Sequence, residues 1–256
     1  MSNILAIAQK ELKSYFASPI AYIVIGLFAL LYGYFYVAIL AYFVRSSMQM
    51  GQFGAGPQSV NINQMMVRPL LQNVTILLLF MMPLVTMRTY SEDKRSGTIE
   101  LLLTSPLTDF QIIMGKFLGA MALWGIMLGV TLIHTAILFV YGHPEWKPIA
   151  TAYLGLLLLG GCFISVGLLI SSLTKNQIVA GMVTFAVFLF LWVITWIGSF
   201  SGPTMDSLTT YLSVIDHFDD FAKGVIDTSH LIYYTSFIAF GLFLTAKSVD
   251  SERWRG

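Results

Sequence analysis

Charged residues and cysteines are scarce in this sequence. Only 11% of the 256 residues are charged, whereas soluble globular domains carry about 25%. A water-soluble fold of this length needs more polar surface, so the composition excludes a soluble enzyme or binding domain. The single cysteine, Cys162, lies in an apolar run. It cannot form an internal disulfide, and we expect it to pack as a small side chain.

The known motifs of nucleotide and metal sites are missing as well. The sequence has no P-loop, no dinucleotide fingerprint, and no cysteine and histidine cluster at metal spacing. It also lacks the nucleophile elbow of serine hydrolases. We therefore expect no cofactor, no metal, no catalytic residue and no nucleic-acid partner for this chain. If the protein does energy-driven work, a partner must supply the energy.

Long apolar runs are what the sequence does contain. Hydrophobic residues make up 57% of it, and the mean hydropathy is +0.77. A membrane-spanning helix needs about 20 apolar residues. The pattern predicts an all-α polytopic membrane protein, one transmembrane domain over residues 1–256 in the lipid bilayer, with six spans at about 19–44, 69–87, 110–141, 149–172, 177–200 and 230–246.

Capping residues support several of these boundaries. Thr108 with Gln111, and Thr174 with Gln177, have the spacing of capping boxes at the starts of the third and fifth spans. Pro83 lies inside the second span and is expected to kink it.

Two segments outside the spans have patterns of their own. Residues 3–16 place apolar side chains at helical spacing, with charged residues between them. This predicts a helix in the membrane interface, and the alternative is an extension of the first span. Residues 45–68 are rich in Gly, Gln and Asn, and we expect irregular structure there.

The distribution of basic residues predicts the orientation. Ten of them fall on one side and four on the other, so the first side is cytoplasmic by the positive-inside rule. Both termini and the Tyr90–Pro106 stretch then face the cytoplasm. The two sets are Lys10, Lys13, Arg88, Lys94, Arg95, Lys116, Lys175, Lys247, Arg253 and Arg255 against Arg45, Arg68, Lys147 and Lys223.

The Tyr90–Pro106 stretch is the longest densely charged segment of the chain. It starts with charged residues, turns at Gly97, and then becomes apolar up to Pro106. A short helix with leucines on one face suits a groove in a soluble subunit. The alternative is a plain interfacial helix with a solvated charge run. The residues expected to dock are Glu92, Lys94, Arg95, Gly97, Thr98, Glu100, Leu102, Leu103 and Pro106.

The same stretch carries a family resemblance. Its residues Glu92, Gly97, Thr98, Glu100, Leu102 and Pro106, followed by Gly115-Lys116, resemble the signature of ABC-2 type transporter permeases. The opening segments Lys10-Glu11-Leu12 and Ser18-Pro19 also fit that family. Residues 216–227, with Tyr233-Tyr234, resemble its gliding-motility permease branch.

The resemblance implies an assembly in the bacterial inner membrane. Two permeases, identical or paralogous, would pair, with two ABC ATPase subunits that bind ATP and Mg²⁺. The N-terminal helix would be the elbow helix, and Tyr90–Pro106 would include the coupling helix that enters a cleft of the ATPase. The chain itself would not be an enzyme.

Two functions remain open within that family. One is export, with a path along the second and fifth spans, for which the aromatic stripe Phe185, Phe188, Trp192 and Trp196 is a candidate wall. The other is force transmission to a membrane partner with a periplasmic domain. Residues 201–229 predict amphipathic helices on the outer face, with His217, Phe218 and Phe221 as candidate contacts. An ATP-independent channel or membrane enzyme is the alternative outside the family.

Three further features have competing interpretations. His134 is the only ionisable residue clearly inside a span, and it is either functional or a neutral side chain hydrogen-bonded to a neighbouring helix. Two pairs of glycines, Gly115 with Gly119 and Gly125 with Gly129, permit close helix contact, which we expect within the chain rather than between copies. The Asp and His residues of 216–220 could hold a metal by type, but a solvated helix face is the preferred interpretation.

Overall fold

The computed structural model describes residues 2–52, 61–99, 106–200 and 209–253, and the regular structure in these ranges is helical. Six helical segments there are long and apolar enough to cross a membrane. This confirms the predicted fold class. The long helices are α2 (Pro19–Gln52), α3 (Arg68–Thr86), α6 (Asp109–Gly142), α7 (Trp146–Leu173), α8 (Gln177–Phe200) and α11 (Thr228–Arg253).

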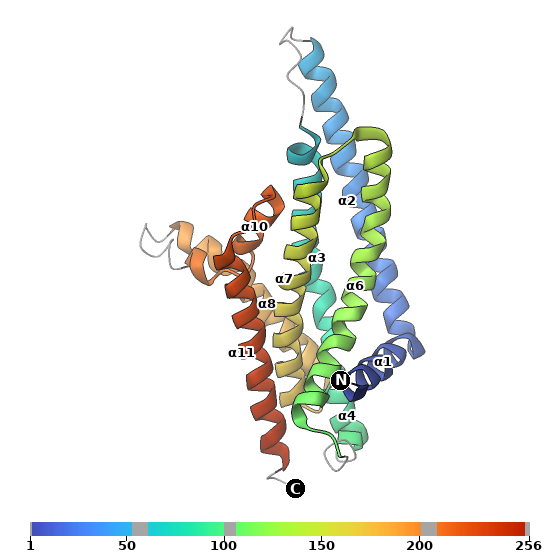
Figure 1. The fold of residues 1–256 in the computed structure, drawn as a ribbon, viewed down its shortest axis with the longest axis vertical. Coiled ribbons are helices and arrows are strands. Elements are labelled where there is room, and N and C mark those ends of the chain that lie inside the picture. Colours follow the sequence, from blue (N-terminus) through green and yellow to red (C-terminus); the bar gives the residue numbers. More distant parts are fainter. Residues whose placement is uncertain (1, 53–60, 100–105, 201–208, 254–256) are drawn as a thin grey trace.

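Short helices lie at the two ends of this bundle. Helices α1 (Ser2–Ala17) and α4 (Ser91–Ser96) lie at the end that also carries the N- and C-terminal regions, called the terminal end here (Figure 1). The π-helix η1 (Asn63–Val67) and α10 (Asp216–Lys223) lie toward the opposite end, with the α6–α7 connection. That end is called the distal end.

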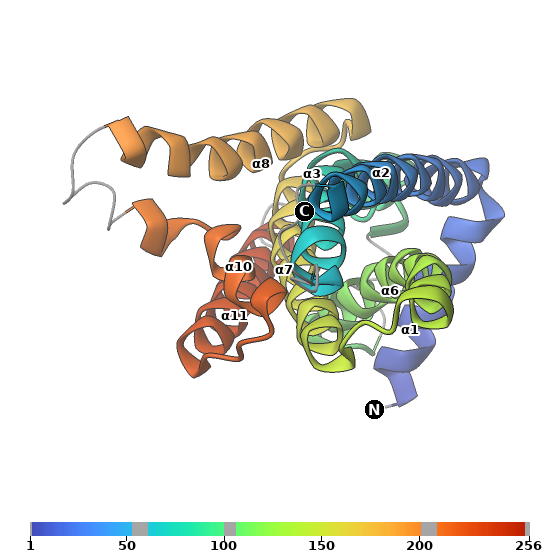
Figure 2. The same ribbon diagram turned by 90° about the horizontal axis from the view of Figure 1, so that it is seen from above.

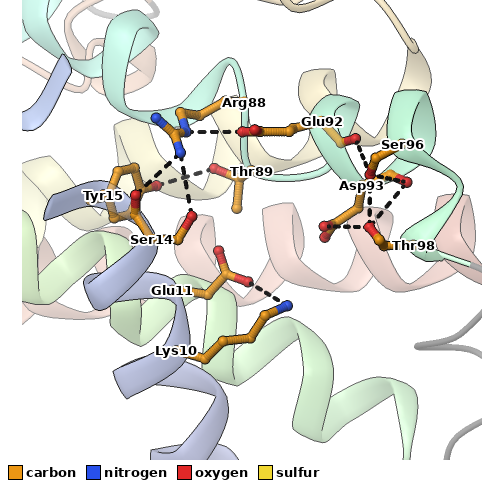
Figure 3. Close-up of a pocket in the computed structure, with 10 residues that line it drawn as sticks. All are labelled: Lys10, Glu11, Ser14, Tyr15, Arg88, Thr89, Glu92, Asp93, Ser96 and Thr98. Carbon is orange, nitrogen blue, oxygen red and sulfur yellow. Dashed lines mark hydrogen bonds and ion pairs between the residues drawn. The ribbon is translucent and has the colours of Figure 1, made fainter. Parts of the chain in front are cut away.

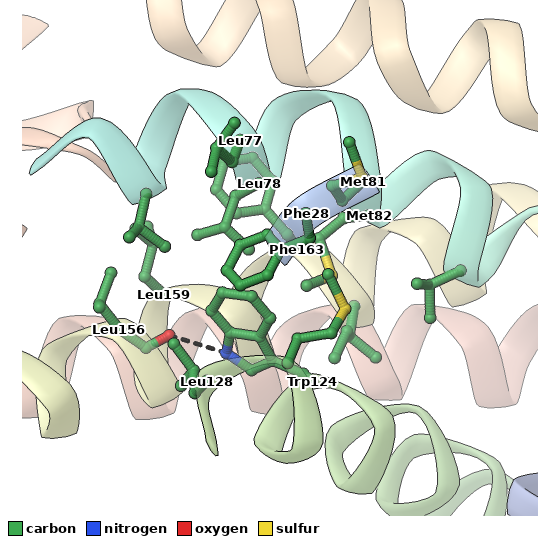
Figure 4. Packing of buried hydrophobic residues seen from close by; sticks show 14 of the residues in the cluster. Phe28, Leu77, Leu78, Met81, Met82, Trp124, Leu128, Leu156, Leu159 and Phe163 are labelled. Carbon is green, nitrogen blue, oxygen red and sulfur yellow. Dashed lines mark hydrogen bonds between the residues drawn. The ribbon is translucent and has the colours of Figure 1, made fainter. Parts of the chain in front are cut away.

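The core is centred on α7, which packs against α3, α6, α8, α10 and α11. Trp124 of α6 is fully buried there, and its indole Nε1–H donates to the carbonyl of Leu156 at 3.0 Å (Figure 4). The ring of Phe28 from α2 meets Trp124 edge-on, with centroids 5.9 Å apart. Helix α8 lies at the edge of the bundle (Figure 2). This packing leaves the faces of α2, α8 and α11 largely uncovered within one chain.

The caps explain where two spans begin. At α6, both hydrogen bonds of the capping box between Thr108 and Gln111 are present. The second predicted box, between Thr174 and Gln177, is wrong. The side-chain carbonyl of Asn176 accepts from the backbone amides of Ile178 and Val179 instead. An asparagine one residue before the helix is a better-placed acceptor for these amides.

The prediction of irregular structure over residues 45–68 is wrong at both ends. Helix α2 continues to Gln52, and η1 begins at Asn63. Within α2, the hydroxyls of Ser46 and Ser47 donate to the carbonyls of residues 42 and 43. Serine hydroxyls that bond back to the preceding turn are compatible with a continuing helix. Polar composition alone therefore does not locate the end of α2 or the start of η1.

Candidate functional site

A buried cluster of opposite charges joins three helices at the terminal end. Lys116 of α6 is 1% exposed, and its ammonium donates to Glu11 Oε1 of α1 at 2.9 Å. It also donates to Asp93 Oδ2 of α4 at 2.6 Å and to the carbonyl of Thr89 at 2.7 Å. An ammonium has three N–H donors, so each of them has an acceptor here. Lys116 thereby ties α1 and α4 to α6.

Small residues on α6 make the contact with α1 possible. A Cβ atom at Gly119 would lie 2.7 Å from the Cβ of Glu11, and one at Gly115 would lie 2.5 Å from the Cβ of Ile7. No side chain fits at such distances, so α1 packs closely only because both positions are glycine. The predicted packing within one chain is wrong for Gly125 and Gly129, where a Cβ atom would meet nothing within 4 Å, but it holds for Gly115 and Gly119. The close contact of α1 with α6 brings Glu11 within reach of Lys116.

A second set of contacts surrounds Arg88, which follows α3. Its guanidinium forms an ion pair with Glu92 (Nε to Oε2, 3.1 Å) and donates to the Oγ of Ser14 at 3.3 Å. It also lies over the ring of Tyr15, 5.6 Å from the centroid. Burial raises the pKa of Tyr15 to about 12. The phenol therefore stays protonated, and it donates to the carbonyl of Val85 at 3.0 Å.

These contacts line a polar cavity of about 220 Å³ between α1 and α4 (Figure 3). On one side are residues of α1, and on the other are Ser96 and Thr98 from the start of the predicted docking stretch. The Thr98 hydroxyl lies 3.0 Å from Asp93 Oδ1, the carboxylate that also accepts from Lys116. The docking stretch and the N-terminal helix therefore share one network. The cavity is lined by Lys10, Glu11, Ser14, Tyr15, Arg88, Thr89, Glu92, Asp93, Ser96 and Thr98.

The structure divides the predicted docking residues into three groups. Those that are exposed are Glu92, Arg95, Gly97, Thr98 and Pro106. Lys94 is buried, because α4 turns this side chain toward the bundle, and its docking role stays a prediction. Gly97, with φ 73°, ends α4 in the left-handed conformation that glycine favours. Outside the described residues lie Glu100, Leu102 and Leu103.

The aromatic stripe of α8 faces its neighbouring helices at two positions. Phe188 is buried against Phe163 of α7, with ring centroids 4.3 Å apart. Phe185 is half-buried and packs against Phe80 of α3, at 5.4 Å. Trp192 is also partly buried, whereas the side chain of Trp196 lies outside the described part of the chain. Within one chain, Phe188 belongs to the core.

At the distal end, α10 presents its polar side and buries its apolar side. Phe218 and Phe221 are buried against Gly155 of α7. These two side chains therefore hold α10 on the bundle, and the expectation that they contact an outer partner does not fit their position. On the polar side, Asp219 forms an ion pair with Arg68 of α3 at 2.6 Å. His217 belongs to a separate polar cluster with His230 and Asp220.

His134 lies between two aromatic rings. The ring centroids of Tyr32 and Tyr36 are 5.2 and 5.0 Å from that of the imidazole. Its Nδ1 is buried and has no hydrogen-bond partner among the described residues. The expected hydrogen bond to a neighbouring helix is therefore not made through this nitrogen, and ring packing holds the side chain instead.

A family model described as "ABC-2 family transporter protein" matches residues 5–246. The chain belongs to this family. The match runs from α1 into α11, so it includes both the Lys116 cluster and the distal helices.

Two curated relatives belong to Escherichia coli strains K12 and O157:H7. Both are named as the probable multidrug ABC transporter permease YbhR, and each is 27% identical to this chain over 147 residues. The aligned region covers 56% of this chain and 39% of the relative. The aligned part of this ABC-2 family member thus spans well under two thirds of the length of these relatives.

The pattern of the sequence does not predict the Lys116 cluster. Glu11 and Lys116 belong to motifs of the family resemblance and Asp93 to the charged start of the docking stretch, and nothing in their spacing links the three. One signal was available: a lysine eight residues into a span needs an acceptor, because a charge in the membrane is costly. Which carboxylates supply it depends on how α1 and α4 fold back.

Proposed function

We propose that this ABC-2 family chain is the transmembrane subunit of an ATP-driven exporter, and that a partner ATPase acts on the Tyr90–Pro106 stretch. The observation that carries the proposal is the buried Lys116 cluster. Asp93 lies at the start of that stretch, and Lys116 connects it to Glu11 of α1. A displacement of α4 therefore moves α1 and α6 with it, because separating them would leave buried charges unpaired.

The proposed assembly contains two permease chains, identical or paralogous, and two ABC ATPase subunits that bind ATP and Mg²⁺. Family membership and the missing P-loop support this division of labour. In it, α1 is the elbow helix, and the terminal end faces the cytoplasm. The ten basic residues on that side support this orientation in the bacterial inner membrane.

We further propose that the cargo consists of small molecules. The multidrug designation of the relatives supports this over force transmission to a partner with a periplasmic domain. The path would run along α3 and α8, with a second chain completing the wall. Phe185 of α8 and Phe80 of α3, which is half exposed, are the aromatic side chains at that seam.

The experiment uses the chain together with its ATPase partner in proteoliposomes. Asp93→Asn should leave ATPase binding intact but lower the amount of dye exported per ATP hydrolysed. The expected loss is about fivefold or more, the low end of typical coupling between sites. Lys13→Met is the matched control, because Lys13 is an exposed charge on α1 outside the cluster. It should leave the export per ATP unchanged.

Two results would contradict the proposal. If the chain moved dye without any ATPase, it would be an ATP-independent channel. If Asp93→Asn kept full export per ATP, the Lys116 cluster would not transmit the motion. Glu92→Gln combined with Gly97→Ala tests the docking stretch separately, and it should weaken ATPase binding while sparing membrane insertion, since no apolar span is changed.

A further inference from the structure

Two histidines meet at the distal end, away from the Lys116 cluster. His217 of α10 is 8% exposed, and its Nδ1 lies 2.6 Å from the Nδ1 of His230 on α11. The opposite nitrogen of each ring also has a partner. His217 Nε2 lies 3.0 Å from the carbonyl oxygen of Tyr211, and His230 Nε2 lies 2.9 Å from Asp220 Oδ2. The four groups form one continuous chain of contacts.

This row of contacts requires one proton more than two neutral imidazole rings carry. A backbone carbonyl can only accept, so His217 Nε2 must carry a hydrogen. Asp220 also accepts from the ammonium of Lys223 at 3.0 Å, as expected for an ionised carboxylate, so His230 Nε2 must carry one too. If both rings were neutral, two Nδ1 lone pairs would face each other at 2.6 Å. One additional proton between them converts this repulsion into a hydrogen bond.

The surrounding charges are balanced by that proton. The half-buried carboxylates of α10 are Asp216, Asp219 and Asp220. Lys223 forms ion pairs with Asp219 and Asp220, and Arg68 of α3 forms one with Asp219. A single imidazolium makes the sum of these charges zero. A second is disfavoured, because burial lowers the pKa of His217, and a positive His230 lowers it further.

The remaining neighbours are neutral or exposed. The ring of Tyr233 lies against His217, with centroids 3.9 Å apart, and its hydroxyl donates to the carbonyl of Leu212. The hydroxyl of Tyr234 donates to the carbonyl of Val214. Asp227, just before α11, is fully exposed. None of these groups competes for the proton between the two rings.

A metal ion fits this geometry less well than a proton. Zinc binds imidazole nitrogen at about 2.0–2.1 Å in tetrahedral sites, which places two ligand nitrogens more than about 3 Å apart. The two Nδ1 atoms are closer than that. No group of three or more metal-ligating side chains is found among the described residues.

We propose that His217 and His230 form a proton-binding site that holds one shared proton and thereby fastens residues 209–223 to α11. Loss of the proton leaves two facing lone pairs, and a second proton places two cations side by side. Either change weakens the contact of α10 with α11. The site therefore makes the distal end of this transporter subunit sensitive to the pH of the compartment that it faces.

Imidazole ¹⁵N spectra of the full chain in lipid nanodiscs test this directly, because the protein has only four histidines. At pH 7.5, two ordinary histidines would together bind about 0.2 proton. The His217–His230 pair should instead bind about one proton, which is roughly fivefold more than two ordinary histidines bind. His230→Gln should abolish this excess proton, whereas His143→Asn, at an exposed helix end, should preserve it. Two singly protonated rings in the wild-type protein would overturn the proposal without any variant.

Two further measurements check the consequence and the rival ligand. At a single pH, amide hydrogen exchange over residues 213–223 should be at least about tenfold faster in His230→Gln than in the wild-type protein, while exchange in α6 stays unchanged. Equal exchange rates over residues 213–223 would contradict the proposal that the pair fastens this segment. Adding Zn²⁺ at micromolar concentration should leave both Nδ1 signals in place. Displacement of the shared proton by zinc would show a metal site and overturn the proposal.

Discussion

Replacing Lys116 by methionine should destabilise the terminal end strongly. Methionine keeps the length and apolar stem of the side chain but removes the ammonium. Glu11 and Asp93, whose side chains are 11% and 16% exposed, then lose their buried cation, and the exposed Lys10 remains only at 4.0 Å from Glu11. Removing one partner of a buried ion pair costs about 3–5 kcal/mol. At about 2–4 °C per kcal/mol for a chain of this size, the apparent Tm should fall by about 6–20 °C.

The single cysteine provides the assay. Cys162 of α7 is 1% exposed, so a thiol-reactive fluorophore reaches it only when the bundle opens. The increase in fluorescence on heating therefore reports the unfolding of the core around α7. Lys13→Met, at an exposed position on the same helix as Glu11, is the matched control and should melt with the wild-type protein.

A rescue variant separates charge from packing. Lys116→Met combined with Glu11→Gln and Asp93→Asn leaves no charge in the cluster, and it should recover most of the lost stability. If Lys116→Met melted within about 2 °C of wild type, the buried ion pairs would contribute little. If the triple variant were less stable than the single one, shape rather than charge would explain the loss. Either result would refute the reasoning.

Three other predictions follow from the same structure. Gly119→Val should displace α1 and lower the free energy of unfolding by about 1–3 kcal/mol. Gly129→Val should be tolerated, because a Cβ atom there meets nothing within 4 Å. The thiol assay measures the stability of both variants. Asn176→Ala should lower stability by about 1 kcal/mol through loss of the α8 cap, read from the same melting curves. Because burial lowers the pKa of His217, the folded His217–His230 pair resists a second proton, which the unfolded chain takes up as the pH falls below about 6.5. Stability should therefore decrease on acidification, and His217→Asn should flatten that dependence of the Tm on pH.

Most of the fold could be predicted from the sequence. A span in lipid must satisfy its backbone groups internally, so a run of about 20 apolar residues has almost no alternative to a helix. This is why six spans and the capping box at Thr108 were predictable from local patterns. The same local reasoning fails at Thr174, because Asn176, one residue before the helix, is the better-placed cap.

The tertiary structure decided which residues meet. The side chains of Glu11, Asp93 and Lys116 come from three helices separated by up to 105 positions along the chain. They form one cluster only because α1 folds back onto Gly115 and Gly119. The His217–His230 pair likewise depends on how α10 lies against α11. Local pattern specifies helices because their hydrogen bonds are local, but buried charge pairs depend on packing between helices, which hydropathy does not encode.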